Sequence, residues 1–244
     1  MRQHAQRKRA RGRGPARWAA FTIVVGVLAG LLVELATAPG YAIRGAEIDG
    51  PAELADSARA CVPIGANAYL TRMGRLERTI ARDLRVEEAH AQRTGGGILR
   101  ISLRPRTAEA QIPLEDGDFG LVDSRGLVFD ERPSRDSATL IGGMERDGAV
   151  VGSRIDPACM GTVRDVRREA SRQRLDPVAE VSFETDGRVH AVLAGGTELR
   201  LGPPEAIRDK IAVAAGAVRS APAATIGYVD VELLQHIVMA PRSR

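Results

Sequence analysis

The chain has 244 residues, with 35 Lys and Arg against 31 Asp and Glu and a formal net charge of +4 at pH 7. This length allows one or two domains of modest size. The excess positive charge lies in residues 1–17, which carry seven basic side chains and no acid, so a basic surface for nucleic acid is excluded over the rest of the chain.

Residues 18–38 are apolar apart from Glu34 and predict a single transmembrane helix. A helix of this length spans roughly 30 Å, which is about the thickness of a bilayer hydrocarbon core. Because basic segments stay in the cytoplasm, residues 1–17 predict a cytoplasmic tail, with the chain after Pro39 on the other side of the inner membrane. The apolar side chains expected to anchor the helix are Trp18, Phe21, Ile23, Val24, Val25, Val27, Leu28, Leu31, Leu32, Val33 and Leu35.

The same segment also fits a cleaved signal peptide, because residues 36–38 (ATA) form a small-x-small cleavage site. Two features favour a retained anchor. The apolar run is longer than that of a signal peptide, and Pro39 directly after the site would fit a protease-bound backbone poorly. A cleaved and secreted envelope protein is the alternative.

Residues 41–107 predict a small α+β module with the order strand, helix, helix, strand, strand. Alternating apolar residues mark the strands, and apolar stripes at helical spacing mark the helices. Two helices can cover one face of a three-stranded sheet, which gives a compact module. The expected strands are 41–49, 86–93 and 98–104, and the expected helices are 51–62 and 71–84.

Residues 108–241 predict a second, mostly antiparallel β domain with two helices. Short apolar runs alternate there with Gly and Asp turns. One helix should begin at Asp156-Pro157 and end near Gln173, and another should follow residues 202–204 and reach Arg219. The expected strands are 119–122, 126–129, 138–141, 178–184, 188–193, 197–201, 228–233 and 235–239.

No arrangement of side chains in the sequence predicts catalysis. The four histidines are scattered, Ser124 lacks the flanking glycines of a nucleophile elbow, and the glycines at 95–97 lie between strands. We therefore expect a protein that is not an enzyme and that has no cofactor, metal or small-molecule substrate. Cys61 and Cys159 each fall on an apolar helical stripe, which favours buried thiols over a disulfide.

This layout resembles the FtsQ (DivIB) family of bacterial cell-division proteins. Residues 199–202 (LRLG), the following helix and residues 228–231 (YVDV) are similar to the family ending "LG, helix, YVDLR". Residues 121–129 (LVDSRGLVF) are similar to its "LVDxxGxVF" hairpin, and residues 43–61 to the opening of its POTRA module. The family's "ERxPVA" junction is altered here to residues 103–108 (LRPRTA).

The resemblance implies a non-catalytic, single-pass scaffold at the division septum, with a POTRA-like module at 41–107 and an FtsQ-type β domain at 108–241. Its implied partners are single-pass coiled-coil division proteins of the FtsB/DivIC and FtsL type. The alternative is a POTRA-type docking or chaperone module for protein export or envelope assembly, which would bind many client strands.

The C-terminal strand is the candidate site, because an exposed sheet edge is a template for an added strand. Alternation would place Gln235, Ile237 and Met239 on one face of the strand and His236 and Val238 on the other. A competing interpretation is that these residues only close the sheet, with Ile237 and Val238 packed inside. The residues expected to bind a partner are Tyr228, Val229, Asp230, Gln235, His236, Ile237, Val238 and Met239.

Overall fold

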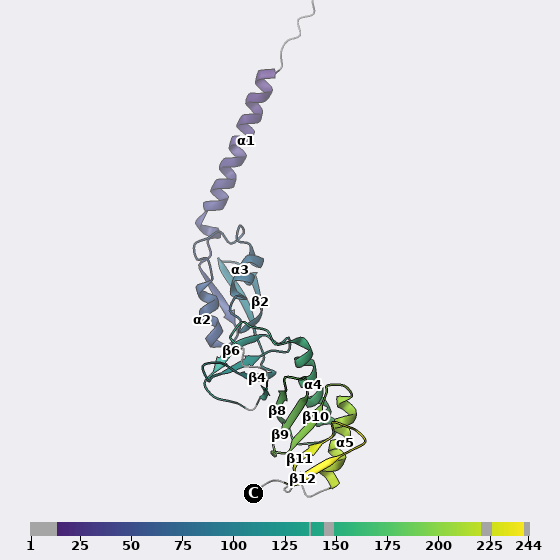
Figure 1. The fold of residues 1–244 in the computed structure, drawn as a ribbon. Coiled ribbons are helices and arrows are strands. Elements are labelled where there is room, and N and C mark those ends of the chain that lie inside the picture. Colours follow the sequence, from purple (N-terminus) through teal and green to yellow (C-terminus); the bar gives the residue numbers. More distant parts are fainter. Residues whose placement is uncertain (1–13, 137, 144–148, 221–225, 242–244) are drawn as a thin grey trace, which may run out of the picture. The chain divides into compact units, whose positions relative to one another are not determined.

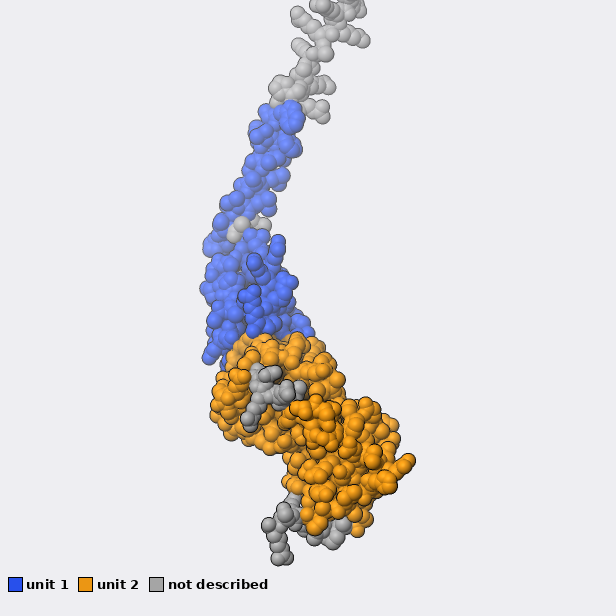
Figure 2. All heavy atoms as spheres, viewed as in Figure 1, with its two compact units in different colours: residues 1–82, 88–104 blue, residues 83–87, 105–244 orange. Residues whose placement is uncertain are grey.

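The structure is a computed structural model that describes residues 14–136, 138–143, 149–220 and 226–241 (Figure 1). The chain divides into two compact units (Figure 2). Unit 1 comprises residues 1–82 and 88–104, and unit 2 comprises residues 83–87 and 105–244. Both units contain helices and strands, so the protein is α+β.

Helix α1 (Gly14–Thr37) covers most of the predicted anchor. The prediction of a transmembrane helix at 18–38 is wrong, because no helix in the described residues is both long and apolar enough to cross a membrane. The apolar side chains proposed as the anchor are exposed from Trp18 to Val33, and the side chain of Leu35 lies outside the described residues.

Unit 1 contains the strand, helix, helix, strand, strand order that the sequence pattern predicts. Its sheet has the order β1-β3-β2, with β1 parallel to β3. Leu99 and Ile101 of the central strand are fully buried, and Leu76 and Ile80 of the second helix are buried too. The elements are β1 (Gly45–Asp49), α2 (Ala52–Ala60), α3 (Met73–Ile80), β2 (Val86–Arg93) and β3 (Ile98–Pro105).

Three elements of unit 1 are shorter than predicted, namely helices α2 and α3 and strand β1. Residues 39–41 form a 3-10 turn, and Ala42 makes an isolated bridge to Asn67, so the strand begins only at Gly45. Helix α2 follows Pro51, whose ring fixes φ near the helical value and which lacks an N–H. Local backbone bonds, which sequence periodicity does not report, therefore set these boundaries.

Unit 2 is built on a nine-stranded sheet in the described residues, with the order β12-β11-β10-β9-β8-β7-β4-β5-β6. Three neighbouring pairs are parallel, namely β4 with β7, β7 with β8, and β10 with β11. The strands are β4 (Ala110–Pro113), β5 (Phe119–Val122), β6 (Val128–Arg132), β7 (Thr139–Gly142), β8 (Val178–Phe183), β9 (Val189–Leu193), β10 (Glu198–Gly202), β11 (Ile226–Asp230) and β12 (Val238–Pro241).

Helices α4 (Pro157–Arg172) and α5 (Ile207–Ser220) supply the crossovers that parallel pairing requires, from β7 to β8 and from β10 to β11. Asp156 caps α4 by accepting a hydrogen bond from the Ala158 N–H at 2.8 Å. The apolar stripes of both helices are buried in one core cluster with the strands, which includes Val163 and Ile211. Cys61 and Cys159 are free thiols and are partly buried.

Candidate functional site

Strand β12 is the outermost strand of the described sheet, beside β11. Met239 lies opposite Val229, and Val238 lies opposite Asp230. One row of backbone N–H and C=O groups on β12 therefore faces away from the sheet. The strand was predicted at 235–239 but begins at Val238, because residues before it form a turn that is closed by a His236 N–H to Leu233 C=O bond of 2.8 Å.

Exposed apolar side chains surround this edge. Ile237, Val238 and Met239 are 49%, 51% and 46% exposed, so none of them closes the core. Gln235 and His236, which belong to the turn before the strand, are exposed as well. A cluster of this kind is typical of an interaction surface. We define the β12 patch as Leu233, Leu234, Ile237, Val238 and Met239.

The three predicted contact residues of β11 have different environments. Val229 is fully buried in the core, so it supports the edge from inside and cannot touch a partner. Tyr228 and Asp230 are half-buried on the opposite face of β11. The Arg200 guanidinium carbon lies 4.0 Å from the centre of the Tyr228 ring, and Arg200 Nε donates to Glu198 Oε1 at 3.0 Å. The cation–π contact therefore orients Tyr228.

The open face of β8 to β11 carries a hollow of about 500 Å³ that the sequence did not reveal. His190 lies between two carboxylates, with Nε2 2.6 Å from Glu184 Oε1 and Nδ1 3.3 Å from Glu198 Oε1. The hydrogen bond that Arg200 donates to Glu198, together with the attraction between their charges, raises the pKa of Arg200. Strand alternation predicts which face of its own strand each of these four residues occupies. It does not predict that β8, β9 and β10 are neighbours, and this pairing brings the four side chains together. Within the described residues, no cluster of three or more metal-binding side chains occurs.

The opposite end of the sheet is protected. Strand β6 ends in the charged residues Asp130, Glu131 and Arg132 and is followed by Pro133. Its first residue also bonds to a covering segment, because Val128 N–H donates to Ser153 C=O at 3.0 Å and accepts from Gly152 N–H at 2.7 Å. Charges, proline and a covering loop are the usual means of blocking an edge. Strand β12 has one such feature, since its last residue is Pro241, but it has no charged residue. Of the two outermost strands of the described sheet, β12 is therefore the less protected.

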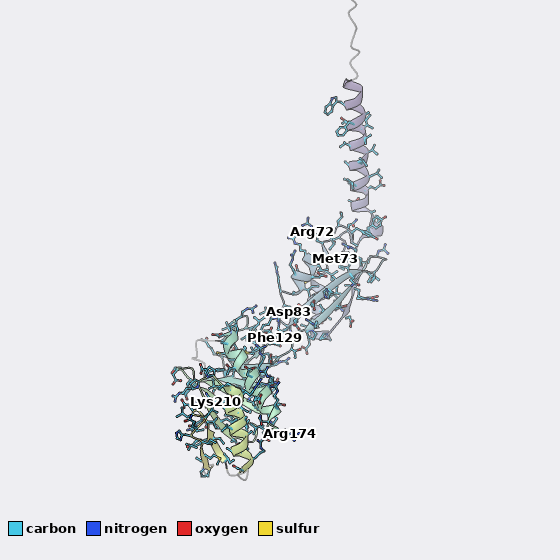
Figure 3. The ribbon with its side chains drawn as sticks, turned by 90° about the vertical axis from the view of Figure 1, so that its right-hand side faces the viewer. Arg72, Met73, Asp83, Phe129, Arg174 and Lys210 are labelled. Carbon is cyan, nitrogen blue, oxygen red and sulfur yellow. The ribbon has the colours of Figure 1, made fainter. Side chains whose placement is uncertain are left out.

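Gly202, the glycine of the LG motif, lies beside the residues that lead into the β12 patch. Its φ is +63°, and a Cβ at this position would come within 3.0 Å of Glu232 Cβ. The next turn is fixed by Lys210 (Figure 3), whose buried Nζ donates to Pro203 C=O at 2.6 Å and whose pKa is lowered by desolvation. Gly202 at the end of β10 therefore packs against Glu232, in the connection between β11 and β12.

The substitution Gly202→Ala should lower the free energy of unfolding of unit 2 by about 1–3 kcal/mol, because it places a side chain at positive φ and against Glu232. Chemical denaturation measures this change. Gly187→Ala is the matched control, since Gly187 also has positive φ but no atom lies within 4 Å of its Cβ position. A smaller effect at position 202 than at 187 would contradict the packing role.

Neither a family model nor a curated protein matches the chain. The features of the chain that bear on function are the outermost strand β12, its neighbour β11 and the exposed apolar side chains of the β12 patch.

Proposed function

We propose that this protein is a non-catalytic scaffold of the bacterial division machinery and that it binds coiled-coil division proteins of the FtsB/DivIC and FtsL type. The partner adds a strand to β12 and covers the β12 patch. The observation that carries the proposal is that β12 is the less protected edge of the sheet, with apolar side chains around it.

The position of the resemblance supports this choice of partner. Residues 199–202 lie in β10, and residues 228–230 lie in β11, the strand to which β12 pairs. The segments most similar to the FtsQ family therefore hold the open edge in place. This support matters because the backbone groups of the edge strand make part of the contact in strand addition.

The size of the edge indicates which contacts the complex needs. A short strand presents about four outward backbone groups, worth about 1 kcal/mol each as net hydrogen bonds. A micromolar complex requires about 8 kcal/mol. The remainder must come from apolar burial, to which a fully covered aliphatic side chain contributes about 1.5–3 kcal/mol. The β12 patch supplies such side chains in Leu233, Leu234, Ile237, Val238 and Met239.

Depletion of the protein in growing cells of the source bacterium tests the proposal. We expect cells that elongate without forming septa, and a fluorescent fusion that gathers in a band at midcell. The contrasting result is normal septation with loss of exported or envelope proteins and an even peripheral signal. That result would refute the division scaffold and favour the docking or chaperone function.

A further inference from the structure

Unit 1 has an exposed apolar surface on the loop between α2 and α3. Residues 64–70 of this loop lie beside residues 41–43, because Ile43 N–H donates to Ala66 C=O at 2.8 Å and Ile43 C=O accepts the Gly65 N–H at 2.8 Å. Large side chains of both segments are exposed to solvent. We define the tyrosine patch as these four side chains: Tyr41, Ile64, Tyr69 and Leu70.

Bonds within unit 1 hold the backbone of this loop in place. Asn67 Oδ1 accepts the N–H groups of Tyr69 and Leu70 at 2.9 and 3.2 Å. Arg93 Nε donates to Ala68 C=O at 2.6 Å. Tyr69 and Leu70 are nevertheless 70% and 66% exposed. Large apolar side chains that cluster on the surface, on a backbone fixed in this way, are typical of an interaction surface.

The two tyrosines of the patch contact each other. The rings of Tyr41 and Tyr69 meet edge to face, with centroids 5.4 Å apart and planes at 84°. A tyrosine ring has an apolar body and a polar hydroxyl, so tyrosine is enriched at membrane interfaces, where an apolar medium meets water. Ile64 and Leu70 add aliphatic side chains to the same loop. The patch therefore has the kinds of side chain that enter the headgroup region of a bilayer.

The charge of the segments that form the patch is positive. Residues 38–46 and 61–82 contain five arginines and one acid, Glu77, whose Oε1 accepts the Ala91 N–H at 2.9 Å. None of these arginines makes an ion pair within the described residues. All five are exposed, and Arg72 is labelled in Figure 3. They are Arg44, Arg72, Arg75, Arg78 and Arg82.

The excess of positive charge remains when the rest of the module is counted. Residues 38–82 and 88–104 together carry nine arginines against six acids. The other exposed arginines of the module include Arg59, Arg100 and Arg104, which are each paired with a carboxylate. The unpaired cations therefore belong to the segments that carry the tyrosine patch, where they favour an anionic partner.

An anionic bilayer surface matches these features together. Its headgroups attract arginine side chains, and the boundary below them accepts aromatic and aliphatic side chains without a complementary shape. Residues 39–41 also follow α1 directly in the chain, and the large apolar side chains of α1 from Trp18 to Val33 are exposed as well. The apolar and cationic side chains thus lie in consecutive or directly bonded segments of one unit.

We propose that the tyrosine patch binds the surface of an anionic lipid bilayer, with its four side chains in the headgroup region and Arg44, Arg72 and Arg75 on lipid phosphates. The contact is interfacial and requires no crossing helix. It does not depend on the partner that binds at β12, because that site belongs to unit 2.

The test places a single fluorescent reporter in the patch of the full chain. Trp18 is the only tryptophan in the sequence, so Trp18→Phe with Tyr69→Trp moves the reporter to position 69. The protein is purified in a non-ionic detergent, which is removed in the presence of vesicles made of equal parts of phosphatidylcholine and phosphatidylglycerol. Lipids with brominated acyl chains should quench the tryptophan strongly. Quenching should be severalfold weaker in vesicles of phosphatidylcholine alone.

A second reporter position is needed because α1 has exposed apolar side chains of its own. Ala52→Trp replaces Tyr69→Trp in the control protein. Ala52 is the exposed first residue of α2, roughly 13 Å along the helix from Cys61, where the arginine-rich segment begins. The tryptophan at this position should be quenched severalfold less. Equal quenching at positions 52 and 69 would overturn the proposal.

Charge removal tests the role of the arginines. Arg44→Gln, Arg72→Gln and Arg75→Gln, combined in the protein with the reporter at position 69, should lower quenching severalfold. The matched control replaces Arg59, Arg100 and Arg104 by Gln and should change quenching little.

Circular dichroism establishes that each variant is folded. Equal losses from the two triple variants would contradict the proposal. Absence of quenching at position 69 on anionic vesicles would refute it and would leave a protein as the partner of the patch.

Discussion

Replacing Arg106 by Met should lower the free energy of unfolding of unit 2 by about 3–5 kcal/mol, because it leaves the Asp123 carboxylate buried without its cation. The two side chains are 14% and 5% exposed, and Arg106 Nη1 lies 2.5 Å from Asp123 Oδ2. Chemical denaturation followed by circular dichroism measures the loss. Arg132→Met, which removes an exposed arginine 3.7 Å from Asp130, is the control and should change stability by about 0–1 kcal/mol.

The reason for this large effect is that Arg106 and Asp123 join three segments of unit 2. Arg106 Nε donates to Leu84 C=O at 2.8 Å, which ties residues 83–87 to the junction before β4. Asp123 Oδ1 accepts from the N–H groups of Arg125 and Leu127 at 2.8 and 2.9 Å, which closes the turn between β5 and β6. A loss below about 1 kcal/mol in Arg106→Met would show that this pair is no stronger than a surface ion pair.

The same pair gives unit 2 a defined acid sensitivity. Burial alone would raise the pKa of Asp123, but the hydrogen bonds from Leu127 and Arg125 and the Arg106 guanidinium outweigh burial and lower the pKa below its ordinary 3.8. A carboxyl group with a depressed pKa stabilises the fold above its unfolded pKa, and the contribution is lost as pH falls through the folded pKa. Wild-type stability should therefore decline below about pH 4, and more steeply than that of Asp123→Asn.

Ile237→Pro should weaken binding of the proposed FtsB/DivIC-type partner by at least about thirtyfold, which corresponds to a loss of about 2 kcal/mol or more. The change removes an exposed apolar side chain of the β12 patch and the N–H that immediately precedes β12. Residue 237 lies outside the strand itself, so the β11–β12 pairing and the unfolding free energy should change little. Isothermal titration calorimetry with the purified partner measures the affinity.

Ile237→Ala separates the two contributions, because it keeps the N–H and removes only most of the side chain. It should weaken binding by less than Ile237→Pro does. Val238→Lys is a second variant, since a charge on an edge strand opposes pairing with another strand. Wild-type affinity in folded Ile237→Pro and Val238→Lys proteins would show that the partner binds elsewhere.

Local signals in the sequence predicted much of unit 2 well. The Asp156-Pro157 start and the apolar stripe of α4 depend on interactions within one helix, so they could be read from neighbouring residues. Hairpins such as β5–β6 were predicted for the same reason, since the Asp123 turn is local. The C-terminal strand was predicted three residues early, because its start depends on the His236 to Leu233 turn bond.

The transmembrane helix at 18–38 was predicted from apolar composition, and this prediction was wrong. Apolar residues alone suggested a crossing at 18–38, but the described residues contain no helix that is long and apolar enough for one. The site was also only partly visible. Val229 alternates with Tyr228 and Asp230 as a strand residue must, yet whether it faces the core or a partner depends on which side of β11 the helix α5 covers.

By itself, the sequence determined the α+β class, the approximate places of α2 to α5 and the turns that depend on glycine, because these follow from interactions between close neighbours in the chain. Only the tertiary structure decided the parallel pairs, the protection of β6, the open edge at β12 and the Arg106–Asp123 pair. The physical reason is that strand order and buried ion pairs bring together residues that are far apart in the chain. Periodicity within one segment does not show which distant segment packs against it.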